Sequence, residues 1–434
     1  MGFKCEKTKI MIYFKYGSEN TVLSSKDIEM GLYSALDKLG VRKKVLVVPP
    51  DITRYHSRAG DLTAMIFQYY SDALKDVLPA LGTHSPMTDN DINIMYKGVP
   101  KGLFRVHNWR EDVATVGSVP GEYVSEITEG KLNYSWPAQL NKLVFRGEHD
   151  LILSVGQVVP HEVIGMANYN KNLFVGTGGR EGINKSHFIG AVYGIERIMG
   201  KANNPVRSLF NYASKNFTSH LPVIYILTVI GREEDCKLVV RGLFIGDDEE
   251  VFNLAAELSL KVNFTVLDTP LKKVIVYLDP SEFKSTWLGN KSIYRTRMAM
   301  ADEGELIVLA AGLKEFGEDK EIDRLIRKYG YRGTPATLKS LDESDDLKNN
   351  LSAAAHLIHS STEERFSITY CPGHLTKDEI ESVNFRYHDL ADMVKKYNPE
   401  ILKDGFNTMP DGEEVFFISN PALGLWSSKE RLLK

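Results

Sequence analysis

The stretch DLILSVGQVVP, from Asp150 to Pro160, indicates the fold of this 434-residue chain. It is a near-continuous apolar run that stops at a proline. Runs of this kind are typical of strands that are buried on both faces, as in a parallel sheet. Similar runs recur along the chain: KVLVVPP (44–50), DVLPALG (76–82), PVIYILTVIG (222–231), CKLVVRGLFIG (236–246), KKVIVYLDP (272–280), ELIVLAAG (305–312) and RFSITYCPG (365–373).

Amphipathic segments that fit helices lie between these runs, at 59–77, 186–200, 247–262 and 320–330. Alternating strands and helices predict an α/β fold of βαβ units. We expect two domains with mostly parallel sheets flanked by helices and an active site in the cleft between them. The boundary is placed in LDTPL (267–271), which gives domains of residues 1–268 and 269–404. The tail, 405–434, carries one more strand and is expected to pack back on the first domain.

The composition is that of an ordinary globular protein, with 43% hydrophobic and 25% charged residues. A formal net charge of −4 argues against a dedicated nucleic-acid-binding protein. Cys5, Cys236 and Cys371 are too sparse for a disulfide framework or a zinc site and are expected to be reduced thiols. The sequence shows neither a signal peptide nor a membrane span, so we expect a cytoplasmic protein without a membrane partner.

Polar residues follow three of the expected strands. Asp51 and Arg54 follow the first, His84 follows the second, and His161 follows the strand quoted above. Ligands bind beyond the carboxyl ends of strands in open α/β sheets, so these side chains are candidates for one site. An arginine suits a carboxylate or phosphate, and a histidine suits proton transfer near neutral pH. The alternatives are a helix-capping aspartate paired with the arginine, and loop histidines bonded to the backbone.

The segment HEVIGMANYNKNLFVGTGGREGINKSH begins at His161, places Lys171 ten residues later and ends at His187. Its glycine cluster includes Gly178 and Gly179, which become candidate cofactor-binding residues because glycine-rich loops let backbone N–H groups approach a phosphate. Neither a Walker loop nor the dinucleotide fingerprint is present. A generic surface loop is the alternative.

A fourth motif, STWLGNKSIYRTRM, places Trp287, Lys291 and Arg295 on one face of an expected helix. A basic, aromatic face can hold an anion, and an ordinary solvated helix face is the alternative. His356 and His359 lie three residues apart on another expected helix, with no third metal ligand nearby, and are taken as structural.

The order and spacing of these motifs resemble the lactate racemase family, whose members use a nickel-pincer nucleotide cofactor. The resemblance extends from Val45 to about Gly312. It implies that Lys171 carries the cofactor, a pyridinium mononucleotide, through a thioamide, and that His187 completes the nickel coordination. Asp51 matches the family's strand-end aspartate, and Trp287 stands where the family has an aromatic side chain near the cofactor. Proteins that synthesise the cofactor are implied as partners.

The resemblance also implies how a small-molecule 2-hydroxy acid is bound and converted. His84 and His161 match the pair of acid/base catalysts, while Arg54 and Lys291 match residues that bind the substrate carboxylate. Hydride passes reversibly to the cofactor, and the planar 2-keto acid is reduced again from either side. Two bases near neutral pKa suit such a reversible isomerase reaction.

The sequence departs from the family pattern at several positions. ANYN (167–170) replaces a serine–glycine–glycine run before the lysine, and Ser186 replaces the asparagine before the nickel-binding histidine. The stretch SDDLKNNLSAAA (344–355) lacks the tryptophan that lies near the substrate in lactate racemase. We therefore expect a substrate larger than lactate, such as a sugar acid, with Asn349, Asn350 and the NYN residues bonding its extra hydroxyl groups.

Two other classes of function compete with a racemase or 2-epimerase. One is a catalytically inactive nucleotide- or organic-acid-binding protein of the same fold, which retention of the lysine and the three histidines disfavours. The other is an NAD-dependent oxidoreductase, which the missing dinucleotide fingerprint disfavours.

Overall fold

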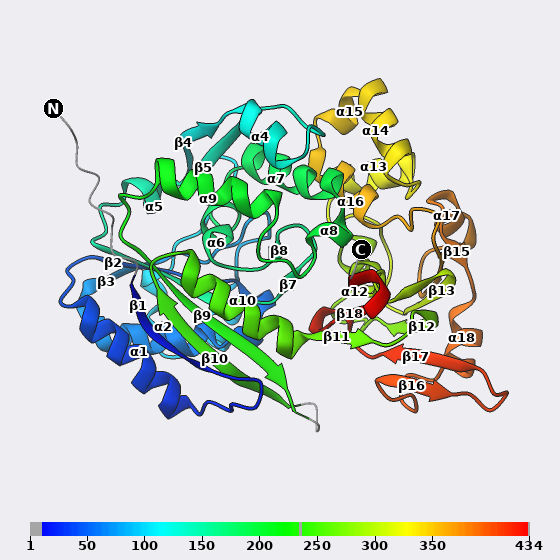
Figure 1. The fold of residues 1–434 in the computed structure, drawn as a ribbon, viewed down its shortest axis with the longest axis horizontal. Coiled ribbons are helices and arrows are strands. Elements are labelled where there is room, and N and C mark those ends of the chain that lie inside the picture. The colour runs from blue at the N-terminus through cyan, green and yellow to red at the C-terminus, as the bar shows by residue number, and fades with distance from the viewer. Residues whose placement is uncertain (1–10, 234–236, 433–434) are drawn as a thin grey trace. The chain divides into compact units, whose positions relative to one another are not determined.

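The computed structural model describes residues 11–233 and 237–432. The chain forms two compact units: the first contains Met1–Ser186 and Gly200–Asn263, and the second contains His187–Met199 and Phe264–Lys434. The second unit thus begins within a few residues of the predicted boundary. The second unit also includes the short segment His187–Met199, which interrupts the first unit in the sequence and was not predicted. Each unit is built around its own six-stranded sheet (Figure 1).

The sheet of the first unit has the order β1-β10-β9-β6-β2-β3. The neighbours β9, β6, β2 and β3 are parallel, whereas β10 and β1 run antiparallel at one side. The short stretch of sequence between β9 and β10 allows only an antiparallel pairing, since a parallel crossover needs a dozen or more residues. The bounds are β1 (Ile12–Gly17), β2 (Val45–Val48), β3 (Leu74–Val77), β6 (Leu151–Gln157), β9 (Val223–Arg232) and β10 (Leu238–Gly246).

Helices cover both faces of this sheet, as the apolar runs predict. Side chains alternate along β9, so Ile224 and Ile226 join the core beneath α1 (Ser25–Leu39) and α2 (Ala59–Tyr70). The opposite face packs against α10 (Glu249–Asn263), which lies along β9 and β10 (Figure 1). A capping box at Ser24 begins α1.

The remaining elements of the first unit are helices and two small hairpins, β4–β5 and β7–β8. One helix, α7, starts in the first unit and continues into the second. The bounds are η1 (Ile52–Ser57), η2 (Ser71–Ala73), α3 (Asp89–Met95), η3 (Lys101–Leu103), β4 (Val113–Val119), α4 (Gly121–Ile127), β5 (Trp136–Asn141), α5 (Lys142–Arg146), β7 (Pro160–His161), β8 (Gly165–Met166), α6 (Asn170–Phe174), α7 (Arg180–Tyr193) and α9 (Pro205–Phe217).

The sheet of the second unit has the order β15-β14-β13-β12-β17-β16, and only the β16–β17 pair is antiparallel. A separate parallel pair joins β11 to β18. The bounds are β11 (Phe264–Leu267), β12 (Leu271–Tyr277), β13 (Met300–Ala310), β14 (Ser367–Pro372), β15 (Arg386–Tyr387), β16 (Gly405–Thr408), β17 (Glu414–Ile418) and β18 (Leu425–Ser428).

The expectation that residues 405–434 pack back on the first domain is wrong for the described part of this tail. Strands β16 and β17 extend the sheet of the second unit, because Val274–Val276 of β12 pair with Phe416–Ile418 of β17. The apolar run of β17 is buried there, and Val415 and Phe417 join the core of that unit.

The helices of the second unit complete an α/β architecture with mostly parallel sheets, which confirms the predicted fold class. No helix in residues 11–233 and 237–432 is long and apolar enough to cross a membrane. The bounds are α8 (Ile195–Ile198), α11 (Thr286–Gly289), α12 (Lys291–Thr296), α13 (Lys320–Tyr329), α14 (Thr334–Glu343), α15 (Asp345–Lys348), α16 (Leu351–His359), α17 (Lys377–Ser382), α18 (Leu390–Lys396), η4 (Pro421–Leu423) and α19 (Lys429–Leu432).

Candidate functional site

The candidate site is built on the carboxyl edge of the first sheet. Strand β2 lies between β3 and β6, and all three are parallel, so the segments that follow them emerge at the same edge. These segments carry Asp51, His84 and His161, as predicted from the strand ends. The turn after β3 is joined to the glycine loop, because the N–H of Gly82 donates to the carbonyl of Gly176 at 2.8 Å.

Asp51 and His84 form a hydrogen-bonded pair, with 2.6 Å between a carboxylate oxygen of Asp51 and Nδ1 of His84. The Asp51 side chain is buried, whereas that of His84 is 55% exposed. Burial alone would raise the pKa of Asp51, but hydrogen bonds from His84 and Thr53 and the charge of His84 outweigh it and lower that pKa. An ionised Asp51 therefore accepts a proton donated by Nδ1, which leaves Nε2 of the neutral His84 ring as an acceptor.

Asp51 also caps η1, because its carboxylate accepts the N–H of Thr53 at 3.0 Å. This part of the alternative interpretation is therefore present in the structure. Its other part, an ion pair with Arg54, is absent from the described residues, where the partner of Asp51 is His84 instead. Arg54 is half-buried and leaves helical geometry, with φ −113° and ψ 30°. Its guanidinium thus stays available at this edge.

His161 lies in β7 and is 8% exposed. Its Nδ1 accepts the N–H of Val163 at 3.1 Å, so the proton of the neutral ring belongs on Nε2. A carboxylate oxygen of Glu162 lies 4.0 Å from Nδ1. The protonation pattern is the opposite of that of His84, since Nε2 is a donor in one neutral ring and an acceptor in the other.

Lys171 is the second residue of α6. Part of its surface is exposed, yet protein atoms surround its ammonium, and this burial lowers the pKa of Lys171 from 10.5 to about 8. The positive charge of Arg54 lowers that pKa further, while the charges of Glu162 and Asp51 raise it. These electrostatic couplings place Lys171 beside the strand-end residues. A considerable fraction of this amine is uncharged, and therefore nucleophilic, at slightly alkaline pH.

Asn172 anchors the helix that carries Lys171. Its side-chain N–H groups donate to the carbonyl of Val48, at the end of β2, at 2.9 Å and to the hydroxyl of Ser154, within β6, at 3.0 Å. The sequence interpretation missed Asn172 and Glu162. Their signal was only that each is a polar residue beside a predicted site residue.

Two glycines of the glycine loop, Gly178 and Gly179, are packed too closely against neighbouring atoms to allow a side chain. A Cβ atom on Gly178 would lie 1.9 Å from the carbonyl oxygen of Phe174, and one on Gly179 would lie 2.5 Å from the side-chain oxygen of Gln139. The Gln139 side chain also accepts the N–H of Gly182 at 3.0 Å. Tight packing against α6 and β5 therefore explains these glycines, and their role in binding a cofactor stays a prediction.

A buried histidine that the sequence did not single out supports the same loop. Nε2 of His107 donates to the carbonyl of Gly178 at 3.0 Å, and its Nδ1 accepts from the Asn141 amide at 2.9 Å. Burial lowers the pKa of His107, so the ring is neutral and this pattern of donor and acceptor is satisfied. His107 is thus a structural link rather than a free acid or base.

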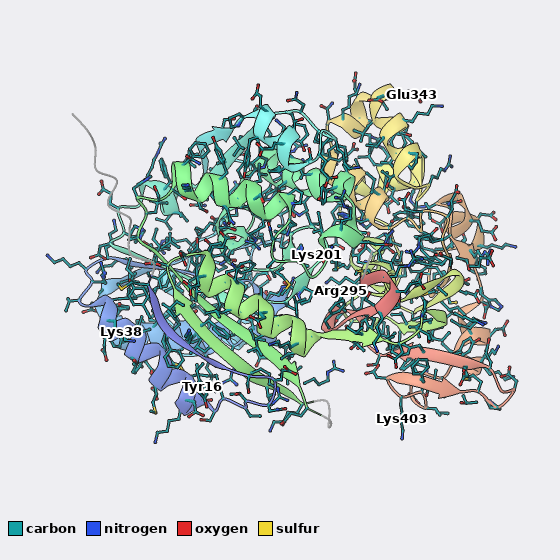
Figure 2. The ribbon with its side chains drawn as sticks, in the orientation of Figure 1. Tyr16, Lys38, Lys201, Arg295, Glu343 and Lys403 are labelled. Atoms are coloured by element: carbon teal, nitrogen blue, oxygen red, sulfur yellow. The ribbon has the colours of Figure 1, made fainter. Side chains whose placement is uncertain are left out.

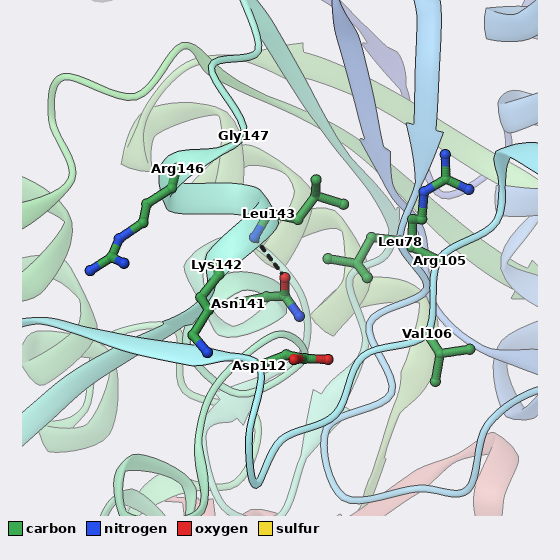
Figure 3. Close-up of a pocket in the computed structure, with 9 residues that line it drawn as sticks. All are labelled: Leu78, Arg105, Val106, Asp112, Asn141, Lys142, Leu143, Arg146 and Gly147. Atoms are coloured by element: carbon green, nitrogen blue, oxygen red, sulfur yellow. Dashed lines mark hydrogen bonds between the residues drawn. The ribbon is translucent and has the colours of Figure 1, made fainter.

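Asn141 also lines an open cavity of about 390 Å³ in the first unit, with Arg105, Lys142 and Arg146 around it (Figure 3). The side-chain oxygen of Asn141 accepts the N–H of Leu143 at 2.8 Å and so caps the start of α5 (Figure 3). None of the predicted site residues lines this cavity. It is therefore distinct from the candidate site.

His187, Trp287 and Lys291 belong to the second unit. His187 is half-buried on α7. Trp287 stacks on His356, with ring centroids 4.4 Å apart and an interplanar angle of 30°. Nζ of Lys291 lies 5.9 Å from the ring centroid of Phe283. Their grouping with the residues of the first unit stays a prediction.

The single helix expected over Trp287–Arg295 is instead two short helices, α11 and α12, separated at Asn290. The Asn290 side chain accepts the hydroxyl of Tyr370 at 2.6 Å, a contact from 80 positions away in the chain. Arg295 is 3% exposed (labelled in Figure 2), so it does not extend a solvent-facing basic surface.

His356 is structural, as expected. It is buried on α16, and its ring nitrogens bond the hydroxyls of Tyr294 and Tyr331 at 2.8 and 3.0 Å. Burial, together with the charge of His359, lowers the pKa of His356 to about 3, so the ring is neutral. Cys371 is a free buried thiol, and Cys5 and Cys236 lie outside the described residues. The described residues hold no cluster of three or more His, Cys, Asp or Glu side chains that could bind a metal ion.

Comparison with known proteins finds a family model that matches part of the chain. The lactate racemase N-terminal domain matches residues 32–196. No protein of curated function matches the chain. A solved structure of a protein from Thermotoga maritima is similar over 95% of this chain and 100% of that chain, with a TM-score of 0.80 and 26% identity. The lactate racemase apoprotein from Thermoanaerobacterium thermosaccharolyticum is similar over 95% and 94%, with a TM-score of 0.69 and 17% identity, a likeness of fold alone.

Proposed function

We propose that this chain is a racemase or 2-epimerase of a 2-hydroxy acid larger than lactate, such as a sugar acid, on the basis of the match of residues 32–196 to the lactate racemase N-terminal domain. The observation that carries the proposal is the complementary pair of histidines at the carboxyl edge of the first sheet. Inversion at C2 requires that a hydroxyl proton be removed and returned. One neutral ring that accepts at Nε2 and one that donates there suit these two tasks.

His84 is the acceptor of this pair. Its Nδ1 is held by Asp51 at 2.6 Å, which orients the ring and stabilises the imidazolium that forms when Nε2 takes up a proton. His161 is the donor, because the N–H of Val163 occupies its Nδ1 and leaves the proton on Nε2. When Nε2 of His161 gives its proton to the substrate oxygen, the ring regains a proton from solvent, and the imidazolium of His84 releases one to solvent, so a turnover neither gains nor loses a proton.

The carboxylate of the substrate is bound by Arg54. Arg54 has no ion-pair partner among the described residues and lies close enough to Lys171 to lower its pKa. A planar guanidinium offers two parallel donors to a carboxylate, which fixes the orientation of the substrate.

The nickel-pincer nucleotide of the family fits the residues present. Lys171, with its pKa lowered to about 8, offers the nucleophilic amine that a thioamide link requires. His187 would provide an imidazole ligand to nickel, Trp287 an aromatic surface, and Gly178 and Gly179 backbone N–H groups. When bound, this group supplies reversible two-electron redox chemistry at C2. The chain's own residues orient the substrate and move the hydroxyl proton.

The proposal of a larger substrate rests on the missing tryptophan in residues 344–355. The asparagines expected to bond extra hydroxyl groups do not support it, because most of them have structural partners. Asn350 caps α16 through the N–H of Ala353, and Asn170 bonds Arg207 and Asn211. Any selectivity for sugar acids therefore depends on the added space rather than on these amides.

Intact mass spectrometry tests the attachment. The chain is co-produced with cofactor-making enzymes, which are the partners that the family implies. We expect an adduct of a few hundred daltons in the parent and in Lys142→Ala, an exposed-lysine control in the same unit. The adduct should be absent in Lys171→Ala. No adduct and no nickel in the parent would favour the catalytically inactive binding protein instead.

Epimer formation from a panel of 2-hydroxy acids tests the chemistry. The loaded parent should convert at least one sugar acid to its C2 epimer, and His84→Ala or His161→Ala should abolish conversion while the adduct remains. If both variants epimerised at the parent rate, the assignment of two bases would be wrong.

A further inference from the structure

The backbone segment just before Lys171 follows a path that residues with side chains rarely adopt. Asn168 and Tyr169 have φ values of 64° and 58°, and ψ of Tyr169 is −138°. Asparagine tolerates the left-handed region, whereas this combination at a tyrosine is nearly confined to glycine. Such a path persists only where surrounding contacts hold it.

A fully buried arginine from α9 makes these contacts. Arg207 is 0% exposed. Its Nη2 donates to the carbonyl of Met166 at 2.7 Å, and its Nη1 donates to the carbonyl of Asn168 at 3.3 Å and to the side-chain oxygen of Asn170. One guanidinium thus bonds three residues of the five that precede Lys171.

Aromatic rings fix the guanidinium from the side. Its central carbon lies 4.3 Å from the ring centroid of Phe252 and 5.6 Å from that of Tyr169. Tyr169 stacks on Phe252, with centroids 5.1 Å apart and an interplanar angle of 17°. The strained tyrosine and the arginine are therefore packed against the same ring of α10.

The contacts of Arg207 contribute little to the stability of the fold. All three acceptors are neutral oxygens, so the buried charge has no carboxylate in contact to offset its desolvation. Burial lowers even the pKa of this guanidinium, to about 10. Apolar packing would fill the space more favourably, which indicates that the charged fork has a local task.

We propose that Arg207 is a positioning residue that holds Met166–Asn170 in its left-handed path and so fixes Lys171 at the carboxyl edge of the first sheet. The importance of Lys171 rests on the proposed function, but the positioning itself is a property of the chain alone. Electrostatics agree, because the charge of Arg207 contributes to the lowered pKa of Lys171.

The test uses the full chain without cofactor or substrate, so its result is independent of the adduct and epimer experiments. Arg207→Met and Arg207→Lys are compared with Arg42→Met. Arg42 also donates to two backbone carbonyls, those of Asp150 and Leu39, but lies before β2, at the opposite end of the strand from the site.

Hydrogen exchange is followed at two backbone amides. The N–H of Tyr169 donates to the Asn168 side chain, and the N–H of Asn172 donates to the carbonyl of Tyr169. In Arg207→Met we expect exchange at these amides to rise at least about tenfold relative to Arg42→Met, because the segment loses three bonds. Arg207→Lys, which cannot span three acceptors, should give a smaller rise.

Acylation of Lys171 by acetic anhydride, measured by peptide mass spectrometry from pH 6 to 10, separates positioning from general stability. The parent rate should have its inflection near pH 8, and Arg207→Met should move it upward, whereas Arg207→Lys, which keeps the charge, should stay near the parent. The proposal is overturned if Arg207→Met and Arg42→Met show the same exchange and the same inflection. If Arg207→Met does not fold, exchange in Arg207→Lys decides: no rise over Arg42→Met overturns the proposal.

Discussion

The lowered pKa of Lys171 has a thermodynamic consequence that can be measured without any ligand. In the unfolded chain this lysine titrates near 10.5, whereas in the folded protein its pKa is about 8. The unfolded state therefore binds the proton more tightly. Since each pKa unit corresponds to about 1.4 kcal/mol, holding the charged lysine in the site destabilises the fold by about 3 kcal/mol at neutral pH. The partial exposure of the side chain reduces this to an expected range of about 1–3 kcal/mol.

Lys171→Met removes the charge and keeps most of the unbranched side chain. We expect the variant to be about 1–3 kcal/mol more stable than the parent at pH 7. The destabilisation is fully present below pH 8 and disappears as the pH rises toward 10.5, so the gain should shrink to less than half by pH 9.5.

Urea unfolding of both proteins at pH 7 and pH 9.5 measures this difference. Lys142→Met, at an exposed lysine, is the control and should change the free energy of unfolding by less than about 0.5 kcal/mol. The reasoning is refuted if Lys171→Met is less stable than the parent at pH 7, or if its gain is equal at both pH values.

Three further substitutions test individual contacts. Asp51→Asn should slow epimerisation by about 100- to 10,000-fold. Because the folded pKa of Asp51 is lowered, the Tm of the parent should also fall by more than the Tm of this variant as the pH falls from 6 toward 3. Gly178→Ala should lower the free energy of unfolding by about 1–3 kcal/mol, since its Cβ would meet the carbonyl of Phe174, whereas Gly102→Ala, with open space around it, should be nearly neutral in urea unfolding. His356→Phe should be about 1–3 kcal/mol less stable at pH 7, because the buried hydroxyls of Tyr294 and Tyr331 each lose one of their hydrogen-bond partners. Between pH 6.5 and 4 the stability of this variant should nevertheless decline less than that of the parent. In the parent, the unfolded His356 binds a proton in this range whereas the folded ring, with its pKa near 3, stays neutral, and the variant lacks this difference.

The sequence predicts the layers of this fold well because apolar runs report burial on both faces. It does not report strand direction, so the run that became β10 looks parallel and is antiparallel to β9. The exchange of chain between the units at His187 could not be predicted either, since α7 is one uninterrupted helical pattern. Direction and domain membership depend on contacts between distant segments, which a local pattern does not contain.

The site follows the same division. Strand ends correctly indicate that Asp51 and His84 share an edge, because parallel neighbours end together, but the 2.6 Å bond between them is a product of folding. Arg207 was missed because an arginine in an amphipathic helix is typical of a solvated face. Asn290, where the expected helix breaks, bonds the hydroxyl of Tyr370 from β14, a contact that the local sequence does not contain.

The most direct test of the central claim follows the hydrogen at C2. The loaded protein is given a single epimer of a sugar acid that carries deuterium at C2, and the product epimer is separated and analysed by mass. We predict that deuterium stays at C2 in the product, because the proton moved by His84 and His161 is that of the hydroxyl. Replacement of the deuterium by solvent hydrogen, or the absence of any epimer from a protein that carries the adduct at Lys171, would contradict the account.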